Sequence, residues 1–216
     1  MDKQSGVVKG NTQTGQAMAI FYGLLNDEEK PKAFEVLLRY IDEADGHFNT
    51  GVLGGRVIYR VLAENGKVDL AYNMIVRPDY PSYGNWVKRG ATTLWEGFYP
   101  ENGRVLSLNH HFWGDVSAWF YTYLAGMRIN PTGKDITNVD IKPFFPEKLD
   151  SVNAYHNLPD GRISASWERI SKDKVVMKIA VAEKLHGKII LPSGYNFDDG
   201  SAEKMLASGE YTLIKS

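Results

Sequence analysis

The spacing of hydrophobic residues changes once along this chain of 216 residues, near residue 131, and this change constrains the fold most. Before it, apolar side chains recur every three or four positions, as in residues 34–41, which predicts amphipathic helices. After it, apolar and polar residues alternate, as in residues 162–170, which predicts half-buried strands. The sequence therefore predicts an α plus β protein of two domains, residues 1–130 and 131–216.

The first domain is predicted to be helical throughout. Successive helices joined by short loops rich in Gly or Asp are typical of antiparallel neighbours. Asn26-Asp27-Glu28 is a helix start signal and Asp45-Gly46 a stop signal, and residues 80–86 are predicted to form an aromatic turn. Trp119 and Tyr123 are predicted to be core residues. The helices are expected over residues 12–25, 29–44, 52–62, 68–76 and 111–127.

The second domain is predicted to be an antiparallel β-sandwich. Turn signals such as Pro159-Asp160-Gly161 separate its strands, because glycine tolerates a positive φ. Ile163, Ala165 and Trp167 are predicted to face the core. The strands are expected over residues 139–145, 151–155, 162–170, 174–181, 187–191 and 211–214.

Composition narrows the function classes. The formal net charge is −1, which argues against a nucleic-acid partner, and no apolar run reaches the roughly 20 residues of a membrane span. There are no cysteines, so disulfides and thiol chemistry are excluded. The polar start of the chain is not typical of a signal peptide, which leaves the localisation open. No cofactor motif is present.

Glu96 is the first candidate for chemistry. It follows Trp95 directly, and a carboxylate beside a tryptophan has less access to water, which raises its pKa and suits a general base. Aromatic rings and a carboxylate together are typical of sites that cleave sugars. The alternative is an ordinary glutamate on a helix surface near aromatic packing.

A second polar group lies at Asn109-His110-His111. These side chains offer donors for sugar hydroxyls, although a structural role as caps at a helix start is the commoner one for such residues. The two histidines are adjacent, no cysteine accompanies them, and no metal site is predicted. Tyr83, in the aromatic turn before Glu96, offers a stacking surface for a sugar, with plain loop packing as the alternative.

Two motifs together resemble a known family. Gly90-Ala91-Thr92-Thr93-Leu94-Trp95-Glu96, followed by Ser107-Leu108-Asn109-His110, resembles bacterial α-L-rhamnosidases, whose catalytic domain is an (α/α)6 barrel followed by a β-sandwich. Shorter matches precede them, at Thr12-Gln13-Thr14, Thr50-Gly51 and Asp69-Leu70-Ala71-Tyr72. The resemblance covers most of residues 11–130 and the strands after them.

The resemblance implies an inverting hydrolase that removes terminal α-L-rhamnosyl residues. It implies that Glu96 is the general base and His110 a sugar-binding residue. Trp95, Asn109 and Tyr83 are predicted as further substrate-binding residues, without a cofactor or a metal.

The resemblance also implies that part of the barrel lies elsewhere. The helices predicted in residues 1–130 make up about half of the twelve in the family's barrel, whose general acid lies in the earlier half. The chain is therefore expected to be the C-terminal half of the barrel with its sandwich, and a homodimer through the exposed half-barrel face is one expectation. Two other functions stay open: a carbohydrate-binding fragment without catalysis, or a related barrel hydrolase for another sugar.

Overall fold

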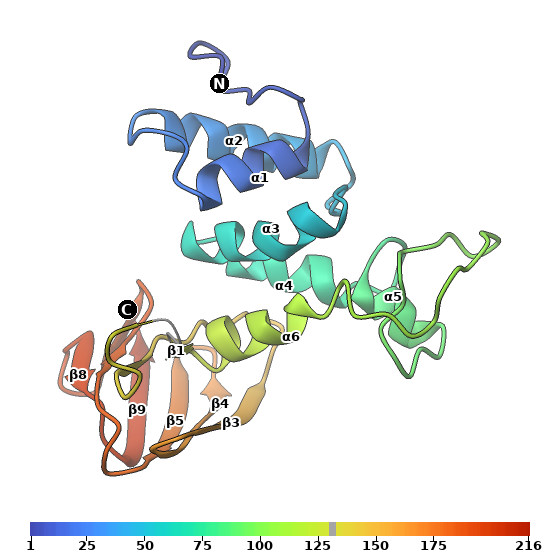
Figure 1. Ribbon diagram of the computed structural model, residues 1–216. Coiled ribbons are helices and arrows are strands. Elements are labelled where there is room, and N and C mark those ends of the chain that lie inside the picture. Colours follow the sequence, from blue (N-terminus) through green and yellow to red (C-terminus); the bar gives the residue numbers. More distant parts are fainter. Residues whose placement is uncertain (130–132) are drawn as a thin grey trace. The chain divides into compact units, whose positions relative to one another are not determined.

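The helical spacing of the first half produces two pairs of helices joined by short loops (Figure 1). Helix α1 (Gln13–Phe21) contacts α2 (Glu29–Asp42), and α3 (Val52–Glu64) contacts α4 (Val68–Val76). Helix α1 also contacts α3, so the two pairs pack through their first members. A shorter helix, α5 (Tyr83–Lys88), follows and contacts α4.

The computed structural model describes residues 1–129 and 133–216, which divide into two units, Met1–Val116 and Ser117–Ser216. The predicted domain boundary falls on residues 130–132, which lie outside the described residues. The division into 1–130 and 131–216 therefore stays a prediction.

The ends of α2 follow from the signals in the sequence. The Asn26 side-chain oxygen accepts hydrogen bonds from the backbone N of Glu28 (3.1 Å) and Glu29 (2.9 Å), while Glu29 Oε2 accepts one from Asn26 N (3.1 Å). This reciprocal arrangement satisfies backbone donors that a helix start leaves unpaired. Asp45 and Gly46 both have positive φ, which ends the helical region. The predicted start and stop signals are confirmed.

One predicted helix is wrong over much of its length. Residues 111–127 were expected to be helical, but the structure has a short α6 (Asp115–Trp119), a π-helical turn η1 (Phe120–Leu124) and then strand β1 (Met127–Ile129). Gly126 has φ +81° and lies so close to Pro143 that a Cβ would be 2.4 Å from its backbone nitrogen. The chain turns there and pairs with a strand, which helical spacing alone does not reveal.

The aromatic turn predicted at residues 80–86 is also wrong in part, because α5 begins inside it. The Ser82 hydroxyl accepts a hydrogen bond from Asn85 N (2.9 Å) and caps this helix. A serine three residues before the amide that it caps is a helix start signal, and it was available in the sequence.

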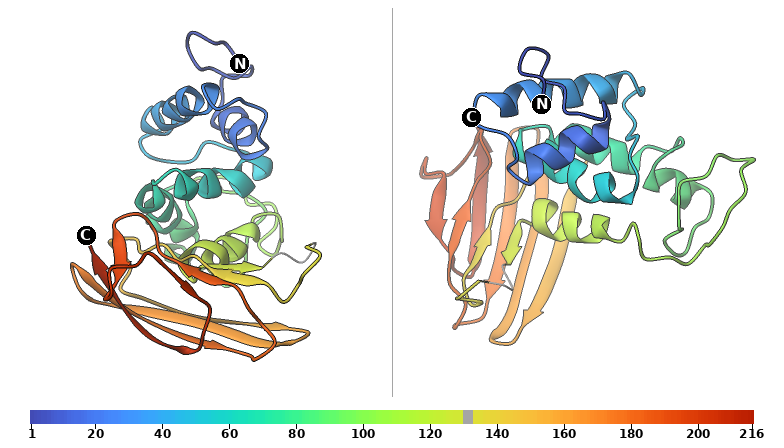
Figure 2. Two further views of the ribbon diagram at one scale, coloured as in Figure 1. Left: turned by 90° about the vertical axis from the view of Figure 1, so that its left-hand side faces the viewer. Right: turned by 45° about the horizontal axis from the view of Figure 1, so that its top comes forward.

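The second unit contains two sheets, whose layers Figure 2 shows from two further sides. One has the order β1-β2-β6-β8 and the other the order β3-β4-β5-β9-β7. Every strand pair is antiparallel except β2 with β6, which is parallel. After β1, the strands are β2 (Val139–Ile141), β3 (Ser151–Leu158), β4 (Gly161–Ser171), β5 (Lys174–Val181), β6 (Lys188–Ile190), β7 (Tyr195–Phe197), β8 (Glu203–Met205) and β9 (Gly209–Lys215).

Both sheets contribute to one hydrophobic core. Ile163, Ala165 and Trp167 on β4 are buried, as their alternation predicted, and Ile141 of the other sheet belongs to the same core. The Trp167 indole donates to the carbonyl of Leu124 (2.8 Å), so its polar edge is satisfied inside the core.

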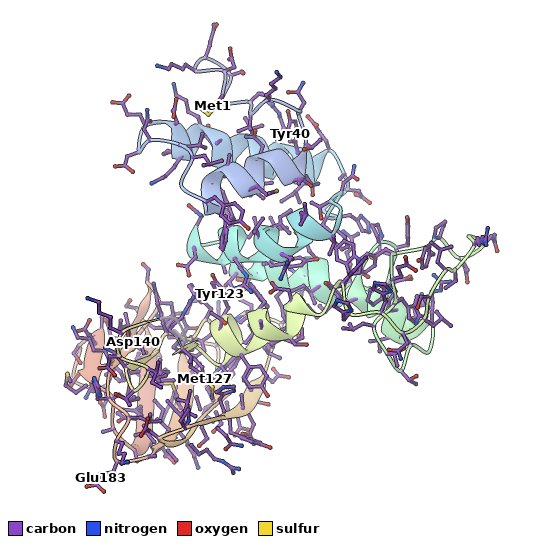
Figure 3. All side chains as sticks on the ribbon, viewed as in Figure 1. Met1, Tyr40, Tyr123, Met127, Asp140 and Glu183 are labelled. Atoms are coloured by element: carbon purple, nitrogen blue, oxygen red, sulfur yellow. The ribbon has the colours of Figure 1, made fainter. Side chains whose placement is uncertain are left out.

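The predicted burial of Trp119 and Tyr123 is confirmed, and Tyr123 and buried Met127 are labelled in Figure 3. Short strands such as β1 and β7 were not predicted, because three residues are too few to show alternation. Among the described helices, none has the length and apolar character that crossing a bilayer requires.

Candidate functional site

The two segments that carry the family motifs lie side by side. Glu96 N donates to the Ser107 carbonyl (2.9 Å), and His110 N donates to the Leu94 carbonyl (2.8 Å). The Thr93 hydroxyl donates to the carbonyl of Leu108. These bonds pair residues 93–96 with residues 107–110 in antiparallel order, so the loop between them returns the chain to Glu96.

Trp113 fixes the backbone at Glu96 from a third segment. Its indole Nε1 donates to the Glu96 carbonyl (2.9 Å), and its side chain is buried. The ring packs on α3 at Gly55, where a Cβ would lie 2.5 Å from the ring atom Cζ3. Helix α3 therefore needs glycine at this position for the indole to reach Glu96.

Sequence reasoning missed both Trp113 and Gly55. Glycine inside a helix costs about 1 kcal/mol relative to alanine, so the pair Gly54-Gly55 within the predicted helix was a signal of close packing. The sequence did not show which ring fills that space.

Seven rings form an aromatic cluster beneath the Glu96 segment. Trp86 stacks on Phe98 with 4.2 Å between ring centroids and lies 5.8 Å from Trp95. Because Trp95 and Phe98 flank Glu96 and belong to this cluster, the backbone around the carboxylate is anchored on both sides. The members are Phe48, Tyr59, Tyr83, Trp86, Trp95, Phe98 and Trp113.

The Tyr83 hydroxyl is engaged in a hydrogen bond inside this cluster. It donates to the Trp113 carbonyl (3.0 Å). Burial and the negative charge of Asp115 raise the pKa of Tyr83 far above its ordinary value. Asp115 itself accepts two hydrogen bonds from Arg60 Nη2 (3.0 and 2.8 Å). Tyr83 therefore stays neutral and acts as a donor at physiological pH.

Arg89 holds the chain just after Glu96. Its guanidinium lies 5.0 Å from the centre of the Trp95 ring, and its Nη1 donates to the Tyr99 carbonyl (2.6 Å). With Lys88 and Glu101 it also lines a polar hollow of about 420 Å³. This contact adds a cation–π interaction to the packing that fixes Trp95.

Polar side-chain atoms of the two motifs lack hydrogen-bond partners among the described residues. Glu96 is half-buried, and within residues 1–129 and 133–216 its carboxylate makes no hydrogen bond or ion pair. His110 Nε2 is buried, and it has no hydrogen-bond partner among the residues that the structure describes. A buried polar atom that stays without a partner costs about 1–3 kcal/mol, so a water molecule or a ligand group is expected beside it. Asn109 is exposed.

The His110 ring is positioned by its neighbours. It stacks on His111 with 5.5 Å between centroids and meets Phe112 edge-on at 4.0 Å. The described part of the chain holds no group of three metal-binding side chains. The arrangement therefore presents one carboxylate and one imidazole, from paired segments, on a rigid aromatic base.

The chain is similar in sequence to known alpha-L-rhamnosidases. An alpha-L-rhamnosidase of Formosa agariphila is 34% identical over 191 residues, which cover 84% of this chain and 20% of the relative. An alpha-L-rhamnosidase of an Alteromonas species is 31% identical over 205 residues, covering 90% of this chain and 22% of the relative. The chain thus spans about a fifth of the length of these curated relatives.

A solved structure matches nearly the whole chain. The crystal structure of the Streptomyces avermitilis alpha-L-rhamnosidase, complexed with L-rhamnose, superposes with a TM-score of 0.85 at 25% identity. The match covers 99% of this chain and 22% of that chain.

The family is decided by two sequence profiles. The six-hairpin glycosidase domain of bacterial alpha-L-rhamnosidases matches residues 1–124, and the C-terminal domain of the same enzymes matches residues 129–204. This chain belongs to the bacterial alpha-L-rhamnosidase family.

Proposed function

We propose that this chain supplies the general base of an inverting α-L-rhamnosidase, with Glu96 as that base. The observation that carries the proposal is the pairing of residues 93–96 with residues 107–110. This pairing brings the Glu96 backbone beside the segment that carries His110. A hydrolase needs its catalytic carboxylate and its sugar-binding groups in one place.

The proposed architecture is the C-terminal half of an (α/α)6 barrel, residues 1–130, followed by a β-sandwich, residues 131–216. The helix pairs α1–α2 and α3–α4, packed through α1 and α3, support the first part. The two sheets around one core support the second. The remaining helices of such a barrel and the general acid lie outside these 216 residues in this proposal.

The proposed reaction is a single displacement at the anomeric carbon. The Glu96 carboxylate takes a proton from a water molecule while the water oxygen forms a bond to that carbon, from the face opposite the leaving group. The glycosidic oxygen leaves with its electron pair and takes a proton from the general acid. The two carboxyl groups of inverting enzymes stand roughly 6.5–9.5 Å apart to hold the water.

The proposed sugar contacts follow from the open polar atoms. His110 Nε2 bonds a rhamnose hydroxyl, and Asn109 contributes its exposed amide. Trp95 and Tyr83 contribute ring surface, since the Tyr83 hydroxyl already donates to Trp113. Glu96 is half-buried between Trp95 and Phe98, so part of its surface stays accessible to the attacking water.

Hydrolysis of 4-nitrophenyl α-L-rhamnoside by the 216-residue chain tests where the acid lies. No release of 4-nitrophenol is expected, because the proposed acid is absent. Turnover that disappears in Glu96→Gln would show that the chain supplies its own acid, alone or across a dimer.

The stereochemistry tests the mechanism in a full-length enzyme that contains this chain. Proton NMR of the first product is expected to show β-L-rhamnose before mutarotation. A first product of α configuration would contradict inversion and the role of Glu96 as a base toward water.

A further inference from the structure

The five-stranded sheet has a polar outer face that the proposed catalytic site does not use. Side chains on this face alternate with those that enter the core, and they meet across the strands in fixed register. Asn153 pairs with Ser166, Ser166 with Lys178, and Lys178 with Glu210. A shallow hollow of about 480 Å³ lies over these four positions.

Four polar side chains that line the hollow have no partner in the described part of the chain. The side chains of Ser151, Asn153, Ser166 and Glu168 make no hydrogen bond or ion pair within the described ranges, 1–129 and 133–216. Hydroxyl and amide groups both donate and accept. They sit on adjacent strands of a sheet without a bulge at these positions, so their spacing is rigid and little ordering is needed for binding.

The charges around the hollow favour a neutral ligand. Lys178 Nζ lies 3.1 Å from Glu210 Oε2, so these two charges offset each other. Glu168 adds a negative charge at the rim and Arg162 a positive charge farther along β4. Lys174 adds a further positive charge at the end of β5. A polyanion such as a nucleic acid would need several unpaired cations at the hollow, whereas the cation that lines it, Lys178, is paired with Glu210.

An exposed ring stands next to the hollow on the same face. Tyr155 is 54% exposed and pairs with Ser164, one step along the face from the pair Asn153–Ser166. The Arg162 guanidinium lies 4.4 Å from the centre of the Tyr155 ring and donates from Nε to Asn157 Oδ1 (2.9 Å). The ring is therefore held in place from one side while much of it remains open to solvent.

We propose that this face binds a neutral oligosaccharide, which makes the second domain a substrate-anchoring site distinct from Glu96. One sugar ring packs its apolar C–H surface on Tyr155, and the next units place hydroxyls against Asn153, Ser166 and Ser151. A chain of sugars suits the row of positions better than a single sugar. The inference rests on the proposed function only for the choice of rhamnose as the probe.

The test is an NMR titration of the ¹⁵N-labelled 216-residue chain with a linear tetrasaccharide of α-linked L-rhamnose. Amide shifts are expected on β3, β4 and β5, with Kd about tenfold weaker in Tyr155→Ala, which removes an aromatic contact of about 1.4 kcal/mol. Tyr155→Phe keeps the ring and is expected to bind as the wild type does. Tyr121→Ala, at an exposed tyrosine of the same unit, is the matched control.

The outcomes separate this site from the proposed catalytic one. Shifts confined to residues 93–110, and unchanged in Tyr155→Ala, would overturn the sheet-face site while leaving the proposed function intact. Shifts on the sheet that persist in Tyr155→Ala and in Asn153→Ala would also overturn it. Shifts on the sheet without any at residues 93–110 would support this site and count against the proposed role of His110.

Discussion

At the residue scale, the account depends on how the Glu96 backbone is held rather than on partners of its carboxylate. The amide of Glu96 binds Ser107, and its carbonyl accepts from Trp113. The carboxylate makes no ion pair among the described residues, which is compatible with the proposed role as a base toward water. Residues far along the chain, such as Gly55, therefore affect the site through packing.

Gly55→Ala is expected to destabilise the protein by about 1–3 kcal/mol, because the added methyl group overpacks against the Trp113 ring. Urea unfolding followed by tryptophan fluorescence measures the loss. Gly51→Ala at the start of the same helix is the control, since a Cβ there meets nothing within 4 Å. Equal stability of the two variants would contradict the packing described for Trp113.

The pair Arg77–Asp79 predicts a dependence of stability on pH. Hydrogen bonds from Arg77 (2.7 and 2.8 Å) lower the pKa of Asp79 from 3.8 to about 2, and His47 Nε2 lies 3.3 Å from the same carboxylate. A lowered folded pKa gives stability that is present above about pH 4 and lost as the pH falls through 2. The side chain is 54% exposed, so solvent screening keeps the contribution below about 1 kcal/mol.

Asp79→Asn is therefore expected to lose less stability than the wild type between pH 4 and pH 2. Thermal unfolding at several pH values measures the difference. Asp42→Asn, at an exposed carboxylate without an ion pair among the described residues, is the control. An Asp79→Asn curve parallel to the wild type would refute the linkage.

The sequence allowed Glu96, His110 and their neighbours to be named as candidates, and the structure pairs the two segments that carry them. Their catalytic and binding roles stay predictions. Trp113 could not be assigned, because its contact with Gly55 joins separate parts of the chain and leaves no local pattern. The hydrogen bond from the Tyr83 hydroxyl to the Trp113 carbonyl could not be predicted for the same reason.

At the element scale, a single buried glutamine joins the N-terminal segment to two helices. The Gln16 amide on α1 donates to the carbonyls of Gly6 (3.1 Å) and Ala33 (2.9 Å), and its oxygen accepts from Val8 N. The side chain is fully buried. The Ala33 carbonyl lies inside α2 and keeps its helical bond, whereas the Gly6 carbonyl and the Val8 amide have Gln16 as their partner in the described part of the chain.

Gln16→Leu is expected to cost about 2–4 kcal/mol, because it leaves the Gly6 carbonyl and the Val8 amide unsatisfied while roughly keeping the volume. Chemical denaturation of Gln16→Leu beside Gln4→Leu measures this, since Gln4 is exposed. A loss below about 0.5 kcal/mol in Gln16→Leu would mean that water replaces these bonds.

Helices and strands were predicted correctly where the hydrophobic repeat extended over many residues and turn residues marked both of its ends. Helix α4 and strand β5 have the predicted bounds, since each carries a full pattern between turn signals. The predicted helix over residues 111–127 is confirmed only in its middle, where α6 continues into a π-helical turn, and it is wrong at its end, where a three-residue strand begins. Helical spacing does not register the strand pairing of Met127 with Ile141.

On the scale of the chain, several large apolar side chains are exposed on the surface of the first unit. Leu24 is 73% exposed and Leu53 58% exposed, and Phe21 and Tyr22 are exposed beside Leu24. Exposed apolar groups of this kind mark surfaces that other protein covers. We propose that the 216-residue chain pairs with a second copy through this part of the half-barrel.

Sedimentation equilibrium of the 216-residue chain is expected to give the mass of a dimer. The double variant Leu24→Glu with Leu53→Glu is expected to be monomeric, since charges in an apolar contact are costly. Val87→Glu, at another strongly exposed apolar residue, is the control. A monomer mass for the wild-type chain would contradict the proposed dimer.

The most direct test of the central claim is hydrolysis of 4-nitrophenyl α-L-rhamnoside by a full-length enzyme that contains this chain. Glu96→Gln is expected to lower kcat by about 10²–10⁴ without changing the unfolding temperature, because the base is lost and the fold is kept. Glu101→Gln, an exposed glutamate in the loop after Glu96, is expected to stay within about twofold of the wild type, as a surface change does. Near-normal turnover in Glu96→Gln would contradict the account.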